Sequence, residues 1–244
     1  LRKGIRPDIV HLHWPDGFAF HKSLCKSLLR SSFLIFLLSI YRLLGAKIVW
    51  TVHNLQSHEQ YHPKTERCFW NRLYRRLDGW IALSDYSAGL MQTHDEIGEL
   101  PQAVIPLGVY PRLGDLVEDP APRSDREKAL LYFGNLRSYK SIPSLIAAFR
   151  ETRGPDMTLT IAGKCDDSHQ EAFLRTNSES DGRIRLQLEF IPDEELEKLI
   201  LSSSGIIIPY SGSLNSGVIF LAMTYGKPVL APKTPTFREV AQNT

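Results

Sequence analysis

The stretch NSGVIFLAMTYGKPVLAP, which runs from Asn215 to Pro232, decides the fold of this chain. An apolar run at residues 205–209 precedes it and predicts a strand, and the small residues Ser216 and Gly217 open a helix. The Gly-Lys-Pro-Val that follows ends this helix and begins another strand. Backbone N–H groups at a helix start attract anions. A strand, loop, helix and strand within ~30 residues therefore predict a nucleotide-binding unit with a phosphate-bearing ligand.

Length and composition indicate a globular protein of two domains. The chain has 244 residues, 43% hydrophobic and 23% charged, and single domains commonly hold ~100–150 residues. The formal net charge of +2 shows no basic excess, which argues against a nucleic-acid partner. Cys25, Cys68 and Cys165 form no C-x-x-C pair, so we expect neither disulfides nor a zinc site. A reducing, cytoplasmic location is the simpler interpretation.

Predicted strands alternate with predicted helices along the whole chain. The strands are expected at residues 8–13, 47–53, 79–83, 103–106, 129–133, 158–162, 184–188, 205–209 and 228–231. The helices are expected at 18–44, 66–77, 86–94, 142–150, 170–176, 193–202, 218–225 and from 236 onward. The polar, proline-containing segment 114–127 predicts a linker. We therefore expect two α/β domains with doubly wound parallel sheets, at 1–113 and 128–244.

The second domain supplies candidates for phosphate binding. Gly134 and Gly163 each follow a predicted strand, where glycine lets the backbone approach a ligand. Arg137 and Lys140 lie in the loop at the carboxyl end of the first of these strands, where open α/β sheets bind ligands. Arg can hold a diphosphate through paired hydrogen bonds and Lys through its point charge. The alternative is that Arg137 and Lys140 are ordinary solvated loop charges. Their position at the ligand-binding edge favours a donor site, which would also include Asn215, Ser216 and Gly217.

The first domain supplies candidates for proton transfer. His53 ends a predicted strand and suits a general base, although a histidine capped by a backbone carbonyl is an equal alternative. Asp16 is an acid candidate for activating an acceptor hydroxyl, although a cap for the helix that follows is the slightly favoured alternative. Alternation places His11 and His13 on one face of their strand. Glu59 lies near His58 and His62, but their spacing fits no zinc pattern, so we predict no metal.

Residues 32–44 are apolar and flanked by basic residues. The run is too short for a bilayer span, which needs ~20 residues. We favour a buried helix; the alternative is a helix that lies on a membrane surface. The chain begins without Met and ends as a helix begins, so both ends look cut from a longer protein.

An ordered series of motifs resembles the GT-B glycosyltransferases, closest to glycosyltransferase family 4 and its bacterial exopolysaccharide members. The matching segments are Asp8 to His13, Thr51 to Asn54, Ala82 to Ser84, Ile105 to Val109, Phe133 to Leu136 with Lys140, Ala222 with Met223, and Gly226 to Pro228. This resemblance implies two Rossmann-like domains, with the nucleotide sugar bound by the C-terminal domain and the acceptor by the N-terminal domain. It implies no metal or other cofactor. Lys140 matches the family's diphosphate-binding Lys, and His53 its active-site His.

The chain also departs from the family pattern. Asn135 stands where an Arg is usual, so Arg137 is the substitute. The Glu-x7-Glu motif would fall on Ser213 and Leu221, neither of which is acidic. The loop at 215–217 is similar to that of β-mannosyltransferases acting on polyprenyl-linked sugars, which implies an inverting transfer from GDP-mannose. The family's Gly-rich first strand and crossing C-terminal helix have no match here.

The resemblance implies a metal-independent transferase that moves a hexose, preferably mannose, from a GDP- or UDP-linked donor to a glycan or polyprenyl-linked glycan acceptor. An inverting course needs a base near the acceptor hydroxyl, and Asp16, His53 and Glu59 are the candidates. Peripheral contact with the inner face of the cell membrane through 32–44 is an additional expectation. Two alternatives remain: a degenerate GT-B domain that binds without turnover, and a nucleotide-sugar 2-epimerase.

Overall fold

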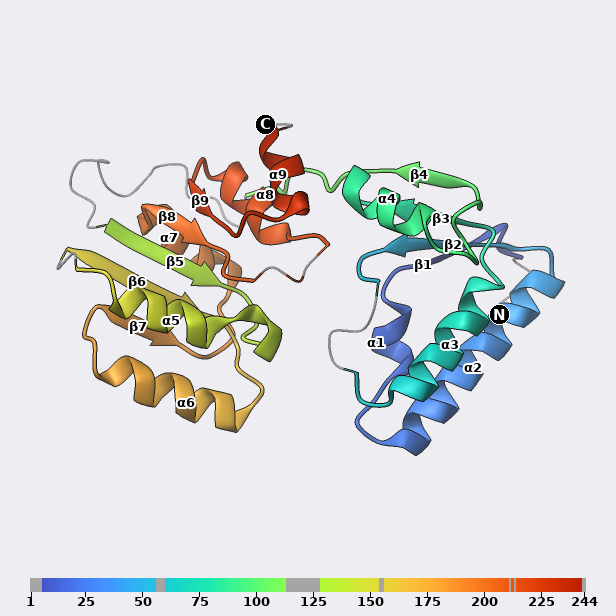
Figure 1. Cartoon of the computed structure of the whole chain (residues 1–244), viewed down its shortest axis with the longest axis horizontal. Coiled ribbons are helices and arrows are strands. Elements are labelled where there is room, and N and C mark those ends of the chain that lie inside the picture. Colours follow the sequence, from blue (N-terminus) through green and yellow to red (C-terminus); the bar gives the residue numbers. More distant parts are fainter. Residues whose placement is uncertain are drawn as a thin grey trace. The chain divides into compact units, whose positions relative to one another are not determined.

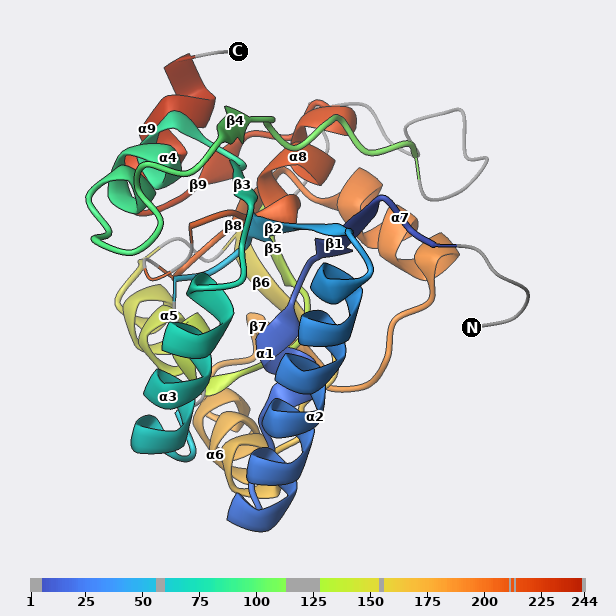
Figure 2. The same cartoon turned by 90° about the vertical axis from the view of Figure 1, so that its right-hand side faces the viewer.

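The computed structural model describes residues 6–55, 60–112, 128–153, 156–210, 212 and 214–242. The chain divides into two compact units, shown in Figure 1 and Figure 2. Unit 1 comprises Leu1–Pro106 with Arg238–Thr244, and unit 2 comprises Leu107–Phe237. The predicted linker at 114–127 lies outside the described residues. Each unit is an α/β layer structure with a parallel sheet, as the alternating pattern predicts.

Unit 1 contains a four-stranded parallel sheet in the order β1-β2-β3-β4. Its strands are β1 Ile9–Leu12, β2 Lys47–Val52, β3 Gly79–Ala82 and β4 Gln102–Val104, and its helices are α1 Pro15–Ala19, α2 Leu24–Leu43, α3 Pro63–Tyr74 and α4 Asp85–Gln92. Ile48, Trp50 and Val52 are buried in the core. A central parallel strand is covered on both faces, which explains its continuous apolar sequence.

The predicted helix at 18–44 is two helices, α1 and α2, separated at residues 20–23. His21 explains the break. Its backbone N–H donates to the Ser27 hydroxyl over 2.9 Å, its carbonyl accepts from the same hydroxyl over 2.8 Å, and its ring Nδ1 accepts from the Ser23 N–H. Side chains that bond to nearby backbone groups compete with the helix ladder and favour a turn.

Unit 2 contains a five-stranded parallel sheet in the order β7-β6-β5-β8-β9. Its strands are β5 Lys128–Phe133, β6 Met157–Ala162, β7 Ile184–Gln187, β8 Gly205–Ile207 and β9 Val229–Leu230; its helices are the short 3-10 helix η2 Ser138–Lys140, then α5 Ile142–Arg150, α6 Ser168–Glu179, α7 Asp193–Ser202 and α8 Gly217–Thr224. From β5 the chain adds strands on one side and then returns to add β8 and β9 on the other. This reversal creates a topological switch point between β5 and β8.

The segment that follows β4 packs with unit 2, which begins at Leu107. Tyr110 makes one of these packing contacts. Its carbonyl accepts a hydrogen bond of 2.9 Å from the Thr224 hydroxyl at the end of α8. The guanidinium of Arg112 also lies 5.7 Å from the centre of the Tyr225 ring. The last helix, α9 Pro235–Gln242, begins in unit 2, and its residues from Arg238 onward cluster with unit 1.

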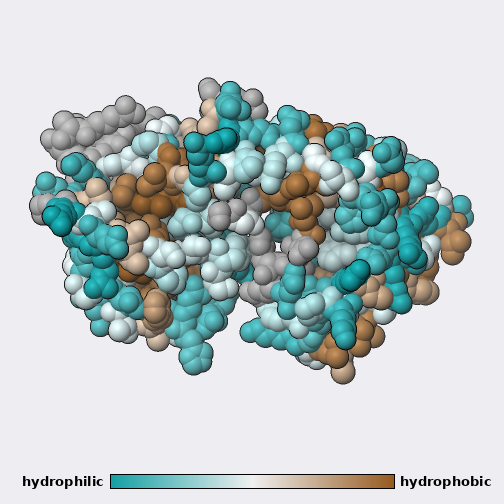
Figure 3. All heavy atoms as spheres, viewed as in Figure 1, coloured by the Kyte–Doolittle hydropathy of each residue, from teal (hydrophilic) through white to brown (hydrophobic). Residues whose placement is uncertain are grey.

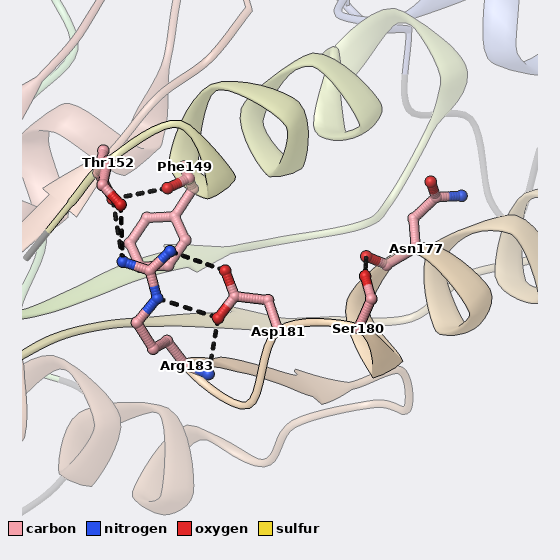
Figure 4. Close-up of polar contacts among 6 residues, drawn as sticks. All are labelled: Phe149, Thr152, Asn177, Ser180, Asp181 and Arg183. Carbon is pink, nitrogen blue, oxygen red and sulfur yellow. Dashed lines mark hydrogen bonds and ion pairs between the residues drawn. The ribbon is translucent and has the colours of Figure 1, made fainter. Parts of the chain in front are cut away.

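An ion-pair network joins the amino ends of β6 and β7, opposite the carboxyl edge of the sheet. Arg183 donates to both carboxylate oxygens of Asp181 over 2.9 and 2.7 Å, and also to the Thr152 carbonyl (Figure 4). Its guanidinium lies 4.9 Å from the centre of the Phe149 ring. Hydrogen bonds from Arg183 lower the pKa of Asp181 to about 2. This network supports the fold and lies away from the ligand edge.

Candidate functional site

The carboxyl edge of the unit 2 sheet brings two predicted glycines together. Gly134 follows β5 and Gly163 follows β6, with φ angles of 118° and 142° that favour glycine. The backbones pack so closely that a Cβ on Gly163 would clash with the Gly134 carbonyl. Gly134 is exposed, and a Cβ there meets nothing within 4 Å. Packing therefore requires glycine at position 163. At Gly134 the backbone is exposed beside the switch point, where a ligand could approach it.

Lys140 spans the switch point. It ends η2, in the loop that follows β5, and its Nζ lies 3.6 Å from the centre of the Tyr210 ring, which follows β8. The Tyr139 ring centre is 5.3 Å away. Burial, with a smaller contribution from Arg137, lowers the pKa of Lys140 to about 8. Within the described part of the chain, the ammonium forms no ion pair with an acid.

Tyr210 connects this lysine to helix α8. Its side chain is 2% exposed, and its hydroxyl lies 2.8 Å from Oγ of Ser216 in a buried hydrogen bond. Ser216 is the N-cap residue of α8, although its side chain caps no backbone N–H among the described residues. The N-terminal end of α8 and the Lys140 ammonium are thus linked through one tyrosine. Both favour an anion.

The remaining predicted donor residues surround this arrangement. Arg137 precedes η2 and is exposed, and Asn215 and Gly217 flank Ser216 at the start of α8. A Cβ on Gly217 would lie 2.9 Å from the Tyr110 hydroxyl, so glycine gives this tyrosine room. Sequence reasoning missed Tyr210 and Tyr110. A buried tyrosine after a strand resembles an ordinary core residue, whereas the isolated Tyr110 carries no motif.

Unit 1 brings together three histidines, as the alternation in β1 predicts for two of them. The His11 and His13 ring centres are 4.4 Å apart. His13 Nδ1 lies 3.0 Å from His53 Nε2, and His11 Nε2 lies 2.7 Å from the Thr51 hydroxyl. The Trp14 ring stacks on His53 with a centroid distance of 3.9 Å. The predicted active-site His53 therefore belongs to a cluster at the carboxyl edge of the sheet.

The cluster keeps His53 neutral. Burial, with smaller contributions from His13 and His11, lowers the pKa of His53 to about 4. A general base works best when its pKa lies near the working pH. A pKa this low makes His53 better suited to a neutral hydrogen-bonding role than to proton abstraction. The hydrogen bond to His13 holds a single proton between the two ring nitrogens.

The two acidic candidates of the first domain have different outcomes. Asp16 lies in the first turn of α1, which begins at Pro15 with Trp14 as its N-cap, so Asp16 does not occupy the predicted cap position. Its side chain is partly buried two residues after Trp14, which stacks on His53. Glu59 lies outside the described residues. In the part of the chain that the structure describes, no cluster of three His, Cys, Asp or Glu residues could hold a metal ion.

Comparison with models of protein families shows which family the chain belongs to. The family model described as "Glycosyl transferases group 1" matches residues 117–244, which is more than half of the chain. The chain belongs to the glycosyl transferases group 1 family. The matched segment contains β5, η2, α8 and the Lys140–Tyr210 pair.

Curated relatives of this group 1 family member are two proteins of Xanthomonas campestris pv. campestris, each described as a GDP-mannose:glycolipid 4-beta-D-mannosyltransferase. One is 27% identical over 237 residues, and the other is 28% identical over 227 residues. The alignments cover 97% and 93% of this chain but only 64% and 62% of those relatives. The chain therefore spans less than two thirds of their length.

Several solved structures share the fold of this group 1 family member. HepE from Anabaena, in complex with UDP and glucose, has a TM-score of 0.67 and 21% identity, covering 96% of this chain and 61% of that one. WaaG, a glycosyltransferase involved in lipopolysaccharide biosynthesis, has a TM-score of 0.67 and 14% identity, covering 88% of this chain and 68% of that one. These likenesses confirm the predicted GT-B fold.

Leu221, where the resemblance places an acidic residue, lies in the core of this group 1 family member. It is 8% exposed and packs with Ile200, Ala222 and Tyr225. An unpaired carboxylate buried among these side chains would be strongly destabilising. The other position, Ser213, lies outside the described residues. The local packing of α8 therefore accounts for the apolar residue at 221.

Proposed function

We propose that this chain is part of a metal-independent glycosyltransferase that moves a hexose, preferably mannose, from a nucleotide diphosphate to a lipid-linked glycan. Unit 2 takes the nucleotide-sugar donor and unit 1 takes the acceptor. The proposed location is the cytoplasm, where Cys25, Cys68 and Cys165 would stay reduced; all three are free in this structure.

The observation that carries this proposal is the Lys140 ammonium, held over Tyr210 at the switch point. Burying a cation without an anionic partner costs free energy, because water can no longer solvate the charge. Among the described residues no acid pairs with this ammonium, and a diphosphate at this edge would supply a negative charge. Arg137, in the same loop, and the N-terminal end of α8 would add hydrogen-bond donors.

The names of the relatives support the choice of sugar and acceptor. Both are described as using GDP-mannose and a glycolipid. Their identity of 27–28% extends over 97% and 93% of this chain. We therefore choose GDP-mannose over UDP-linked donors and a lipid-linked glycan over a free one.

In the proposed reaction, the cations of unit 2 and the histidine cluster of unit 1 have different roles. As the bond between the sugar and the diphosphate breaks, negative charge develops on the leaving group, and Lys140 and Arg137 stabilise it electrostatically. The neutral His53 hydrogen-bonds a sugar hydroxyl. The proposed inverting course also needs a base for the acceptor hydroxyl, and Asp16 and Glu59 remain as candidates because the low pKa of His53 makes its ring a poor proton acceptor.

Isothermal titration calorimetry with GDP and UDP tests the donor assignment. We expect saturable binding of GDP that is tighter than that of UDP and that weakens about tenfold or more in Lys140→Met, because a charge-assisted contact is lost. Lys198→Met is the matched control, since Lys198 is exposed on α7. Equal GDP affinity in Lys140→Met and wild type would contradict the assignment.

Turnover is tested separately by release of GDP from GDP-mannose in the presence of a polyprenyl-diphosphate-linked oligosaccharide. Acceptor-dependent release supports transfer. GDP binding with no release under any acceptor would instead favour a domain that binds the donor without turnover.

A further inference from the structure

Helices α3 and α4 enclose a groove on one face of the unit 1 sheet, and we call it the α3–α4 groove. The crossovers from β2 to β3 and from β3 to β4 step in the same direction, and right-handed crossovers of this kind place their helices on the same face. Both helices can be followed in Figure 1 and Figure 2. The groove encloses about 500 Å³, which lies within the range of ~300–1,000 Å³ that is usual for ligand pockets.

Two aromatic rings of α3 line the α3–α4 groove. Trp70 and Tyr74 lie one helical turn apart, and their rings stack with a centroid distance of 5.7 Å. Both rings also pack on the buried Trp50 of β2, at centroid distances of 5.3 and 6.0 Å. The ring of His94, just after α4, meets the Tyr74 ring edge-on at 4.7 Å. These contacts fix the two rings, so a ligand that packs on them does not have to order them.

The α3 side of the groove also contains polar groups with unused hydrogen-bonding capacity. Glu66 is 5% exposed; its Oε1 accepts a hydrogen bond of 3.2 Å from the His62 N–H, whereas its Oε2 has no partner among the described residues. Within the same part of the chain, the Trp70 indole N–H and the Tyr74 hydroxyl also lack a hydrogen-bond partner. A ligand that enters the groove must satisfy these groups, because burying them unpaired would be costly.

Exposed side chains of α3 add further donors and acceptors. Arg67 and Asn71 line the groove, and their side chains form no hydrogen bond or ion pair with another described residue. Arg67 only donates, Glu66 only accepts, and Asn71 does both. Burial and the Glu96 carboxylate raise the pKa of Tyr74 to about 12, so its hydroxyl is protonated at neutral pH and can donate. On the face of the molecule seen in Figure 3, hydrophilic and hydrophobic residues lie side by side over the part of unit 1 that contains α3 and α4.

A neutral sugar matches this combination of groups. Each sugar hydroxyl both donates and accepts, so it can bond with a carboxylate, an amide and a guanidinium alike. The C–H face of a sugar ring is apolar and packs on aromatic rings. An anionic ligand would be repelled by the Glu66 carboxylate. A purely apolar ligand would leave the polar groups of the groove unsatisfied.

The α3–α4 groove leads away from the histidine cluster. Leu55 also lines it, two residues after His53, and two residues of chain span at most ~7 Å. From there the lining residues extend from Pro63 to Tyr74, the first and last residues of α3. A helix of 12 residues is about 18 Å long. The groove is therefore long enough for more than one sugar unit.

We propose that the α3–α4 groove binds neutral sugar units of a glycan, at a site separate from the donor edge of unit 2. The sugar ring packs on Trp70 and Tyr74, and its hydroxyls bond with Glu66, Arg67 and Asn71. The choice of a glycan rests on the proposed glycosyl transfer, whereas the site itself needs neither donor nor turnover. The sugar units belong either to the acceptor, beyond its reacting unit, or to a glycan that is not a substrate.

Saturation-transfer difference NMR with mannobiose, maltose and lactose tests this site on the 244-residue chain. We expect at least one of these neutral disaccharides to bind with a Kd in the millimolar range. Arg67→Met with Asn71→Leu should weaken that binding about tenfold or more, because two hydrogen-bonding side chains are lost. Tyr74→Phe keeps the ring and removes only the hydroxyl, so it should weaken binding about threefold.

The matched control is Arg72→Met with Gln92→Leu. It makes similar changes at exposed residues of α3 and α4 that do not line the groove, and it should bind the disaccharide like wild type. Thermal unfolding of each variant confirms that it is folded. Calorimetry with GDP on the same samples keeps the donor assignment distinct: normal GDP binding without disaccharide binding contradicts the groove alone, and the reverse contradicts the donor site alone.

The GDP-release assay identifies the source of the sugar units. A KM for the polyprenyl-diphosphate-linked oligosaccharide that rises in Arg67→Met with Asn71→Leu, at unchanged kcat, assigns them to the acceptor. An unchanged KM, together with weakened disaccharide binding, assigns them to a separate glycan. Both results support a sugar site in the groove.

Three results would overturn the proposal. The first is a folded wild-type chain that binds none of the three disaccharides at up to about 10 mM. The second is equal disaccharide binding by wild type and by Arg67→Met with Asn71→Leu. The third is displacement of the bound disaccharide by inorganic phosphate, because the groove would then be an anion site.

Discussion

Lys140 and Tyr210 meet across the switch point of the unit 2 sheet, with Nζ 3.6 Å from the ring centre. The lysine comes from the loop after β5 and the tyrosine from the segment after β8. The ring face carries partial negative charge and attracts the ammonium, and this attraction strengthens in a desolvated site. Tyr210 therefore acts as a positioning residue that fixes where the positive charge is presented.

Replacement of Tyr210 by leucine should weaken GDP binding by about tenfold, because the ammonium loses its aromatic support and the lysine side chain must be ordered on binding. Tyr210→Phe keeps the ring and loses only the bond to Ser216, so its effect should be smaller, ~1 kcal/mol or less. Calorimetry on both variants separates the contribution of the ring to GDP binding from that of the hydroxyl. If Tyr210→Phe binds as poorly as Tyr210→Leu, the hydroxyl and not the ring is the important group.

Nucleotide binding should weaken as the pH rises through about 8, the pKa of Lys140, because the neutral amine cannot pair with a diphosphate. The folded pKa lies below the unfolded value of ~10.4, so the unliganded protein should also gain stability between these two pH values. Measurement of GDP affinity between about pH 7 and about pH 10 gives the dependence of binding on pH. Lys140→Arg should flatten it, because arginine stays charged throughout.

His13→Phe should raise the pKa of His53 from about 4, because it removes the nearby positive charge that disfavours a second proton. Burial remains the largest cause, so the value should stay below the ordinary ~6.5. The depressed pKa also means that the folded state loses stability as the pH falls from about 6.5 towards 4. Histidine titration by NMR measures the change, with the His169 signal in unit 2 as an internal reference. An unchanged His53 titration would show that His13 contributes nothing.

Gly163→Ala should destabilise the chain more than Gly134→Ala. Both positions have a φ angle that alanine rarely adopts, which costs about 1–3 kcal/mol. At Gly163 the added methyl group also clashes with the Gly134 carbonyl, whereas at Gly134 it enters open space. Urea-induced unfolding measures the free energy of unfolding of both variants. A larger loss for Gly134→Ala would show that the close approach of the two loops is not what requires glycine at 163.

The fold follows from local patterns that the sequence expresses directly. The helices at 142–150 and 193–202 have the predicted bounds. Pro143 in the first turn of α5, and Asp193, Glu194 and Glu195 in that of α7, are typical of helix starts. Strand positions also agree within a few residues, because buried parallel strands are continuously apolar.

The site was predictable only in part. Lys140 and His53 could be named because each follows a strand at the ligand edge. Their partners could not: the hydrogen bond between His13 and His53 joins residues 40 positions apart, and Tyr210 reaches Lys140 only through the strand order. Similarly, the break before α2 depends on the Ser27 side chain reaching back to His21. Such contacts depend on tertiary geometry that periodicity does not encode.

The origin of Lys140 and Tyr210 on opposite sides of the switch point has a consequence for protein engineering. A chimera that joined residues up to β7 from one homologue to the segment from β8 onward of another would combine a lysine and an aromatic platform that had not evolved together. Donor preference should therefore not transfer with either half alone. Recombination that keeps the η2 loop and the β8–α8 loop from the same parent preserves the contact between Lys140 and Tyr210, so the two loops should be exchanged together.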